Sequence, residues 1–437
     1  MATSSLLSAL EAWQHHKRWL LGYSGGLDST VLLHQLATLA KHPPLHAVHI
    51  NHQLSPHADA WQQHAQRVCA QLQIPITVIK VAVPENHGRG LEDAARAARY
   101  QAFESVIEEG DVLMLAHHQD DQAETMLLRL LRGAGVRGLA GMPAQREIGL
   151  GHLLRPLLAQ SKSELVSYAN THQLEYIIDE SNDDLTLDRN YLRHNVMPLL
   201  ETRWPGFARN WAHSGDVLAG TSEALDVLAD TDASACGLQR ESFGCSLQLG
   251  ELQTLSRSRA YGVLRHACEQ FSVPPLPRNA FNAIMQELIA ARADGQPKVS
   301  WTGGEARRFD NCVYLLCELP EVCSSADTVW QRSDLDQNLL EATFDGSGRL
   351  QVEWLRPPPL GLSVRIGFRQ GGEVIRATGR NSKHLKQWFQ EQRVPPWLRE
   401  RTPLLFVQQE LIAVGETCVS RSDDWEIKNI RLMRAPY

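Results

Sequence analysis

The feature that most constrains the fold is an alternation of apolar runs and helical patterns over the first 180 residues. Between the apolar runs, stretches such as 28–40 and 123–131 repeat their apolar positions at helical spacing. Strand and helix in alternation predict parallel strands joined by crossover helices, and so a doubly wound α/β sheet of the Rossmann-like kind. Ligands of such sheets bind beyond the carboxyl ends of the strands. The strand-like runs are 19–23, 46–50, 76–81, 112–116 and 175–178.

The rest of the chain has a different pattern of apolar and turn residues. Residues 213–293 are mostly helical in pattern, a β-rich stretch that includes 312–317 follows, and three consecutive prolines at 357–359 suggest a stiff connector. We therefore predict three domains. They are an α/β catalytic domain over 1–214, a mainly helical middle domain over 215–345 and a small α+β C-terminal domain over 346–437.

Composition limits the cellular setting. No run of about 18 apolar residues is present, so we expect no membrane-spanning helix. The first 21 residues lack the long apolar stretch and cleavage site of a secretory signal. Eight cysteines include no C-x-x-C pair, which disfavours a zinc ribbon or a disulfide framework. We expect a reduced, cytoplasmic protein, with a homodimer left open.

Charge is unevenly distributed along the chain. Residues 361–437 hold thirteen Lys and Arg against eight Asp and Glu, a net +5, which leaves −12 for residues 1–360 of a chain of net −7. A basic C-terminal region is typical of nucleic-acid binding, although a solvated basic face without a partner would look the same.

The loop after the first strand carries the first candidate site. Ser24-Gly25-Gly26-Leu27-Asp28-Ser29-Thr30 stands between the strand and the next helix. Glycines at such a turn let the backbone approach a phosphate, and Asp28 could hold Mg²⁺. The loop lacks the Gly-Lys-Ser/Thr ending of a P-loop NTPase. The alternative is a simple turn in which Asp28 caps the helix.

A second candidate follows the strand at 112–116. The segment 117–125 reads H-H-Q-D-D-Q-A-E-T, and the carboxylates of Asp120, Asp121 and Glu124 would suit an ammonium group or Mg²⁺. Asp121 and Glu124 also match a helix-capping pattern, so that interpretation stays open. Two adjacent histidines without a third ligand disfavour zinc.

A glycine-rich segment at 133–138 fits the dinucleotide pattern G-x-G-x-x-G, but it follows a helix instead of a strand. We therefore expect a glycine loop near the active site, flanked by Arg132 and Arg137.

The S-G-G-L-D-S loop resembles that of the N-type ATP pyrophosphatase (PP-loop) superfamily, whose members cut ATP between its α and β phosphates and transfer AMP. Further motifs follow in order along the chain: Asn51-His52, L-E-x-x-A-R-x-x-R-Y at 91–100, H-H-x-D-D-Q-x-E-T at 117–125, R-G-A-G-x-x-G-L-x-G-M at 132–142, D-x-S-N at 179–182 with R-N-x-x-R at 189–193, F-R-Q-G-G-E at 368–373, and 386–404. Together with the S-G-G-L-D-S loop, they make the chain resemble the tRNA(Ile)-lysidine synthetase family over almost its whole length.

The resemblance implies a ligase that joins free L-lysine to C2 of the wobble cytidine in the isoleucine tRNA with a CAU anticodon. ATP first adenylates the cytidine, and the product reads AUA instead of AUG. By this resemblance ATP binds Ser24, Gly25, Gly26, Leu27, Asp28, Ser29, Asn51 and His52, and Mg²⁺ binds Asp28. Asp121 and Glu124 would form the lysine pocket.

The remaining implied roles concern catalysis and RNA, and the resemblance implies that the middle domain (215–345) and the C-terminal domain (346–437) both bind the tRNA. Arg189 and Arg193 would pair with a carboxylate or a phosphate, and either a carboxylate or His117 would take the lysine proton. The residues expected to bind tRNA are Arg132, Arg137, Arg369, Lys383, Lys386, Arg393 and Arg399. Trp388 and Trp397 either stack on bases or lie in the core.

Three other functions are disfavoured. A tRNA cytidine thiolase shares the phosphate loop but needs paired cysteines, and an amidotransferase needs a glutaminase domain; the sequence shows neither. A catalytically inactive tRNA-binding protein would be expected to lose Asp28 or the carboxylates at 120–124, and all of them are present.

Overall fold

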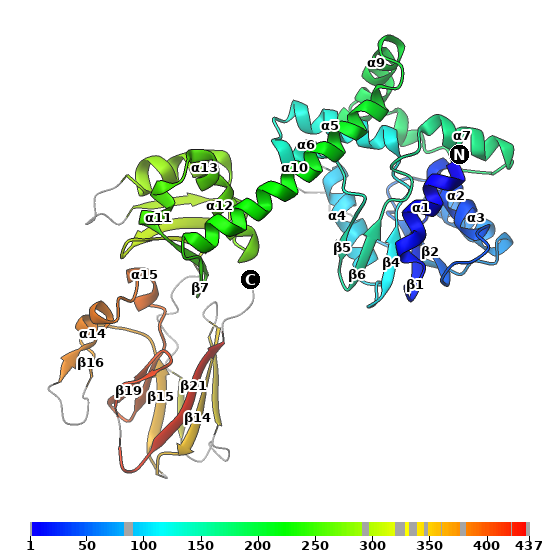
Figure 1. Ribbon diagram of the computed structural model, residues 1–437. Coiled ribbons are helices and arrows are strands. Elements are labelled where there is room, and N and C mark those ends of the chain that lie inside the picture. The colour runs from blue at the N-terminus through cyan, green and yellow to red at the C-terminus, as the bar shows by residue number, and fades with distance from the viewer. Residues whose placement is uncertain are drawn as a thin grey trace. The chain divides into compact units, whose positions relative to one another are not determined.

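The computed structural model describes residues 2–82, 91–290, 297–319, 328–331, 339–344, 348–359, 361–375, 382–420 and 422–433. The chain forms two compact units, Met1–Ala224 and Leu225–Tyr437, which are described separately (Figure 1). No helix of the described residues is both long and apolar enough to cross a membrane.

The first unit is built on a six-stranded sheet of order β3-β2-β1-β4-β6-β5. All neighbours pair in parallel except the last two, which form an antiparallel hairpin. This confirms the predicted doubly wound, mostly parallel sheet. The strands are β1 (Arg18–Gly22), β2 (Leu45–Asn51), β3 (Ile76–Lys80), β4 (Asp111–Met114), β5 (Gln145–Ile148) and β6 (Gly151–Leu154).

Both faces of this sheet are buried. Along β1, Trp19 and Leu21 enter one apolar core while Leu20 enters another, because successive side chains of a strand point to opposite faces. Phe103 of α4 packs with the Leu20 side, and Leu165 of α7 with the other. The helices are α1 (Ala2–Leu10), α2 (Leu27–Ala37), α3 (Ala58–Gln71), α4 (Leu91–Glu104), α5 (Gln119–Leu131), α6 (Val136–Leu139), α7 (Lys162–Thr171), α8 (Asp188–Tyr191) and α9 (Met197–Arg203), and the π-helical turn η3 is Leu192–Val196.

The strand expected at 175–178 is wrong. Only Ile177 forms a bridge, to Gly26 of the phosphate loop, and Ile178 is 78% exposed. The apolar side chain of Ile177 instead lies against the phosphate loop, beyond the end of the sheet. The hairpin of β5 and β6 takes the place at the sheet edge, and its polar, glycine-containing sequence gave no strong strand signal.

Helices and a sheet share the middle of the chain. The helical region expected at 213–293 is present as α10 (Phe207–Ala235), α11 (Leu249–Thr254), α12 (Arg257–Gln270) and α13 (Arg278–Ala283). These helices beyond α10 pack on an antiparallel sheet of order β7-β8-β11-β10-β9, through a core that includes Phe281 and Leu315. The strands are β7 (Gln239–Glu241), β8 (Gly244–Gln248), β9 (Lys298–Trp301), β10 (Gly304–Phe309) and β11 (Cys312–Cys317).

The C-terminal part combines small sheets with two short helices. β12 and β13 precede residue 346 yet pair with β15 and β14, so this module begins upstream of the expected boundary. Trp397 is buried against Tyr314 and Phe309 of the middle sheet, so it belongs to the core. The elements are β12 (Thr328–Gln331), β13 (Leu339–Phe344), β14 (Gly348–Arg356), β15 (Ser363–Gly367), β16 (Val374–Ile375), β17 (Lys383–His384), α14 (Leu385–Glu391), α15 (Pro396–Arg399), β18 (Leu404–Val407), β19 (Glu410–Val414), β20 (Thr417–Cys418) and β21 (Glu426–Met433).

Candidate active site

The loop between β1 and α2 has the geometry of an anion cradle. Gly25 adopts φ +87°, a left-handed conformation that favours glycine, and a Cβ there would lie 2.7 Å from the Ile177 side chain. Gly26 is the N-cap of α2, and no side chain caps this end. The first amides of α2 therefore have no intrahelical acceptor and point toward a ligand at the helix N-terminus.

Hydroxyl groups hold this loop in place. The Ser24 and Ser29 hydroxyls lie 3.1 Å apart, Ser29 donates to the Gly26 carbonyl, and Thr30 donates to the Gly25 carbonyl. Asp28 lies inside the first turn and is not a cap, so the alternative of a merely capping aspartate is wrong. Its carboxylate is left for other partners.

Those partners are a lysine and a histidine from distant segments. The Lys162 Nζ lies 2.7 Å from Asp28 Oδ1, and the His118 Nε2 lies 3.7 Å from Asp28 Oδ2. Lys162 opens α7, and its backbone N–H donates to Asp120 over 2.8 Å. Sequence reasoning missed Lys162, because a single lysine at a helix start carries no motif.

His118 is buried among three carboxylates. Its ring nitrogens lie 3.4 Å from Asp121, 3.6 Å from Asp120 and 3.7 Å from Asp28. Burial by itself lowers the pKa of His118, but the interaction with Asp120 and the charges of Asp121 and Asp28 outweigh burial and raise the pKa. This histidine, and not its neighbour, is the imidazole that the fold places among the acids.

His117 lies in a different environment. The Arg155 Nε donates to its Nδ1 over 3.3 Å, and burial is the largest cause that lowers the pKa of His117 to about 3. The charges of the nearby arginines act in the same direction. At neutral pH His117 is therefore uncharged and a weak base.

A compact group of two acids and two arginines adjoins His118. Arg189 donates to Glu124 over 2.8 Å and to Asp121 over 3.0 Å. Arg193 donates to the two oxygens of Glu124 over 2.7 and 2.9 Å and contacts Asp121 at 3.3 Å. We call Asp121, Glu124, Arg189 and Arg193 the acid–arginine cluster. Its four charges balance.

Asp121 is strongly held in its charged form. Burial raises the pKa of Asp121, but His118 and Arg189 outweigh it and the pKa falls to about 2. Asp121 also accepts the His118 backbone N–H over 3.0 Å, at the third position of α5. The expected capping pair is therefore corrected: His118 is the N-cap, and Glu124 is 2% exposed and caps nothing.

Asn51 and His52, which were expected to bind ATP, lie at the carboxyl end of β2. The Asn51 amide nitrogen donates to Asp59 and Gln62, and its oxygen accepts the Gln53 N–H. Burial, with Arg99 and His49 nearby, lowers the pKa of His52 to about 4. The Asn51 side chain thus has internal partners, and its role toward ATP stays a prediction.

The glycine-rich segment is tied to α5. Arg129 donates to the carbonyls of Gly138 and Gly141, and the Gln122 amide exchanges hydrogen bonds with the Met142 backbone. This supports the expected loop beside the active site. Arg132 and Arg137 are exposed on it, and Arg132 lies 3.5 Å from Asp188.

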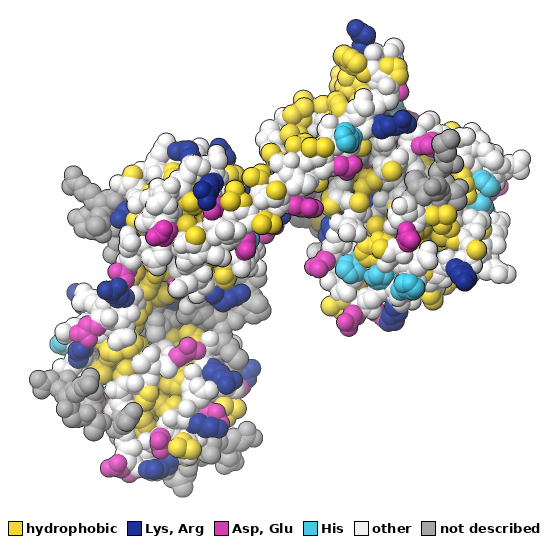
Figure 2. Space-filling view, in the orientation of Figure 1, with side chains coloured by type: hydrophobic (Ala, Val, Ile, Leu, Met, Phe, Trp, Pro, Cys, Tyr) yellow, Lys and Arg dark blue, Asp and Glu magenta, His cyan; other side chains and the backbone are white. Residues whose placement is uncertain are grey.

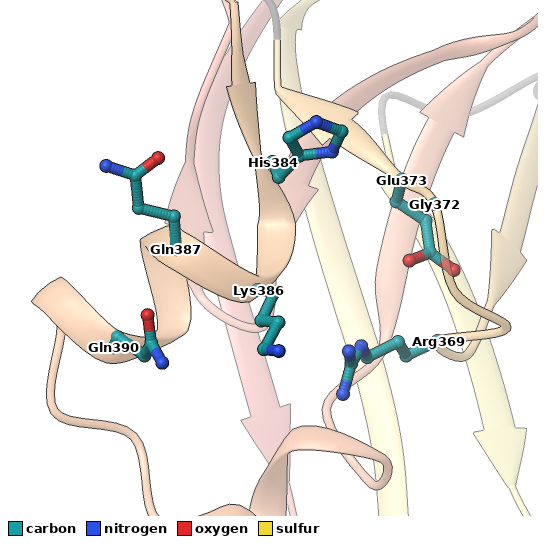
Figure 3. Close-up of a pocket in the computed structure, with 7 residues that line it drawn as sticks. All are labelled: Arg369, Gly372, Glu373, His384, Lys386, Gln387 and Gln390. Atoms are coloured by element: carbon teal, nitrogen blue, oxygen red, sulfur yellow. The ribbon is translucent and has the colours of Figure 1, made fainter.

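The five basic residues expected to contact tRNA in the C-terminal part have different surroundings. Lys383 pairs with Glu391, Arg393 with Asp310, and the Arg399 Nε donates to the Val394 carbonyl. Arg369 and Lys386 instead line an open pocket of about 320 Å³, whose side chains Figure 3 shows. The other lining residues are Gly372, Glu373, His384, Gln387 and Gln390.

The donor set fits Mg²⁺ when phosphates are present. Within the described ranges, no group of three or more His, Cys, Asp or Glu side chains is arranged to hold a metal ion. Mg²⁺ is usually bound by one or two carboxylates together with substrate phosphates. Asp28 at the phosphate loop would supply such a carboxylate, and in this structure Lys162 neutralises its charge.

Comparisons with known proteins find matching family models and relatives along most of the chain. Residues 2–200 match the family model of the PP-loop domain, 247–314 that of the TilS substrate binding domain, and 364–431 that of the TilS substrate C-terminal domain. The tRNA(Ile)-lysidine synthase of Pseudomonas syringae pv. tomato is 42% identical over 417 residues, which cover 94% of this chain and 91% of that protein. The chain belongs to the tRNA(Ile)-lysidine synthase family.

Other family members match over similar lengths. The synthase of Legionella pneumophila (strain Lens) is 40% identical and that of Pseudomonas aeruginosa 41%, and the matches cover 92% and 94% of this chain and 92% of each relative. The chain is therefore an ATP-binding PP-loop enzyme of tRNA modification, as its motifs indicate. Among solved structures, the U34-tRNA thiolase NcsA of Methanococcus maripaludis aligns with a TM-score of 0.42 at 16% identity, over 50% of this chain and 77% of that one.

Proposed function

We propose that this protein attaches free L-lysine to C2 of the wobble cytidine in the isoleucine tRNA with a CAU anticodon, and that it uses ATP and releases AMP and pyrophosphate. The cytidine oxygen is adenylated first, because it is a poor leaving group until AMP is attached to it. The lysine side-chain amine then displaces AMP, and the codon read changes from AUG to AUA. The observation that carries this proposal is the convergence of the phosphate loop, Asp28 and the acid–arginine cluster around His118.

The phosphate loop supplies the ATP site. The open amides at the start of α2 and the hydroxyls of Ser24 and Ser29 suit the outer phosphates of ATP. Mg²⁺, held between Asp28 and those phosphates, would neutralise their charge. Lys162 is then free to leave Asp28 for a phosphate oxygen, since both partners attract its ammonium group.

The acid–arginine cluster supplies the lysine site. Asp121 and Glu124 bind the α-ammonium of lysine, and an arginine of the pair binds its α-carboxylate. Each new ion pair replaces one that exists within the cluster, so no charge is left buried and unpaired. The side-chain amine of lysine then extends toward the cytidine.

The attacking amine must lose a proton, because its ordinary pKa is about 10.4. With its pKa near 3, His117 is a poor acceptor at neutral pH. The carboxylates near His118 are no stronger as bases, because hydrogen bonds outweigh burial and lower the pKa of Asp120, and the pKa of Asp121 is about 2. We propose Asp120 as the acceptor on access alone, since it is the most exposed of them, with 43% of its side chain accessible.

The tRNA body binds the basic C-terminal part. Arg369 and Lys386 face the open pocket and are available to RNA phosphates, whereas Lys383 and Arg393 must first leave their acidic partners. Arg132 and Arg137 contact the RNA near the active site. We place the reaction in the cytoplasm, where tRNA and ATP meet.

One assay tests the reaction. Purified protein, ATP, Mg²⁺, labelled lysine and total bacterial tRNA are mixed, and label in RNA is measured together with AMP and pyrophosphate. We expect label only when ATP and the CAU tRNA are both present, and no label with the Asp28→Ala variant. Release of ADP and phosphate, or label in RNA without ATP, would overturn the proposal.

The same assay separates lysine transfer from sulfur transfer, because a tRNA thiolase shares the phosphate loop. In one reaction a sulfide donor replaces lysine, in a second both are supplied, and the RNA from each is analysed for sulfur. A thiolase would add sulfur to the RNA and leave the lysine unconsumed. We expect instead that lysine is consumed and that no sulfur enters the RNA.

A further inference from the structure

The short helix α9 presents an unpartnered face. Leu199 is 70% exposed, and Trp204, which directly follows the last helical residue, is 59% exposed. Figure 1 shows α9 standing away from the sheet of the first unit, and Figure 2 shows hydrophobic side chains beside Lys or Arg side chains at its free end. Large exposed aromatic residues are uncommon on a surface without a partner.

Other side chains of α9 hold the helix in place. Met197 and Leu200 pack on Phe207 and Ala208 of α10 and on Ala123 of α5. The exposed face is therefore not needed to hold the helix in place. Because most of the Trp204 side chain is exposed, its contribution to the apolar core is small.

The charge around this face favours an anionic partner. Residues 197–209 carry two arginines against one glutamate, a net +1 within a chain of net −7. The guanidinium of Arg203 lies 5.7 Å from the centre of the Trp204 ring. An arginine stacked on a tryptophan combines a positive charge with a flat apolar surface, the combination that binds unpaired nucleobases and their phosphates.

The same chain segment connects this face with the active site. Arg193 of the acid–arginine cluster lies in η3, and η3 continues directly into α9. At about 1.5 Å per helical residue, the eleven steps from Arg193 to Trp204 span about 16 Å. That distance suits a neighbouring base of the loop that carries a reacting cytidine.

We propose that Trp204 and Arg203 form a stacking platform for an unpaired base of the RNA loop that contains the target cytidine. This inference rests on the proposed function. Trp204 stacks on the base, and Arg203 contacts its phosphate, so that the loop is held open beside the acid–arginine cluster. A second copy of the chain, or another protein, would not need this excess of arginine. Binding of such a partner to this face is an outcome of the test.

The test uses the full chain and a short RNA hairpin with the anticodon loop. Binding is measured by fluorescence anisotropy, and 2-aminopurine placed at single loop positions reports stacking. The variants are Trp204→Ala, the conservative Trp204→Phe, and Leu150→Ala as a matched removal of an exposed apolar side chain elsewhere. The KM values for ATP and lysine are measured in parallel.

We expect Trp204→Ala to raise the hairpin Kd and the tRNA KM about tenfold, which is what loss of one stacked base predicts. It should abolish the 2-aminopurine quench at one loop position and leave the KM for ATP unchanged. Trp204→Phe and Leu150→Ala should bind within about twofold of the parent protein.

Parent-like RNA binding and quenching by Trp204→Ala would overturn the platform while parent activity upholds the proposed function. If the parent protein itself adds no lysine to tRNA, the proposed function fails. The hairpin titration still tests whether Trp204 stacks on a base of the loop. A concentration-dependent dimer that Trp204→Ala disrupts, with RNA binding unaffected, would assign the face to a second copy.

Discussion

Lys162 donates from its Nζ to Asp28 Oδ1 over 2.7 Å, joining two residues 134 positions apart in the chain. The carboxylate that lies at the phosphate loop is thus neutralised by a lysine that starts a different helix. Because 43% of the Lys162 side chain is exposed, we expect this pair to add little to folding stability. Its contribution belongs to nucleotide binding.

Lys162→Met should therefore weaken ATP binding without weakening the fold. We expect the KM for ATP to rise at least tenfold, because a phosphate contact and the partner of Asp28 are lost together, and the unfolding midpoint to stay nearly constant. Steady-state kinetics with ATP varied at saturating lysine and tRNA give the KM. Lys162→Arg, which keeps the charge, should recover part of the affinity, and an unchanged KM in Lys162→Met would contradict this role.

Glu124→Gln should destabilise the protein. Glu124 is 2% exposed and accepts hydrogen bonds from Arg189 and Arg193, so its neutralisation leaves two arginines short of a counter-charge. We expect a loss of about 2–4 kcal/mol in the free energy of unfolding, measured with a denaturant. The exposed Asp188→Asn, which removes the pair with Arg132, should change it by less than about 0.5 kcal/mol.

Asp121→Asn tests the lysine pocket. We expect the KM for lysine to rise far more than the KM for ATP, because Asp121 belongs to the acid–arginine cluster and not to the phosphate loop. Both KM values come from the same purified variant, so any general loss of active protein would lower kcat instead. Equal KM values for lysine in the variant and the parent would refute the assignment.

The lowered pKa of His117 predicts how the free energy of unfolding depends on pH. Burial lowers the pKa of His117 to about 3 in the folded protein, against an ordinary value of 6.5. The unfolded chain therefore binds a proton first, and stability falls as pH drops below 6.5. The loss at pH 5 should be about 1–2 kcal/mol from this residue. His117→Asn should flatten the change in unfolding free energy between pH 7 and pH 5, and an unaltered slope would exclude His117 as its source.

Arg369→Ala combined with Lys386→Ala tests the C-terminal pocket. We expect weaker tRNA binding and a salt dependence of the Kd that is shallower by about one to two in log–log slope, since each phosphate contact releases counterions. Filter binding at several salt concentrations measures both. The KM for ATP is the internal control, and a parent-like salt slope would show that these side chains contact no phosphate.

This double substitution is a sharper test than removal of residues 361–437. β14 pairs with β21, and the core around Trp354 takes Ile366 and Leu405 from the segment that truncation would delete. A truncated chain would expose that core. Loss of tRNA binding would then report unfolding instead of a missing contact.

The sequence by itself determined the sheet and the location of its chemistry. Alternating strand and helix patterns predicted parallel strands, and the motifs at 24–30 and 117–125 both follow such strands, so their proximity at the carboxyl edge was predictable. The family, and with it the class of enzyme, was evident from motifs in order along the chain.

Only the tertiary structure decided which acidic side chain pairs with which basic one. Asp28 pairs with Lys162 and Asp121 with Arg189 because α7 and α8 return to the same edge of the sheet, and no local pattern encodes that return. Likewise, His118 and His117 are neighbours of the same type and both are buried, which lowers the pKa of each. Around His118 the carboxylates outweigh burial and raise the pKa, whereas nothing outweighs burial at His117, where Arg155 acts in the same direction. Charge environments arise from segments far apart in sequence, and a local pattern cannot supply them.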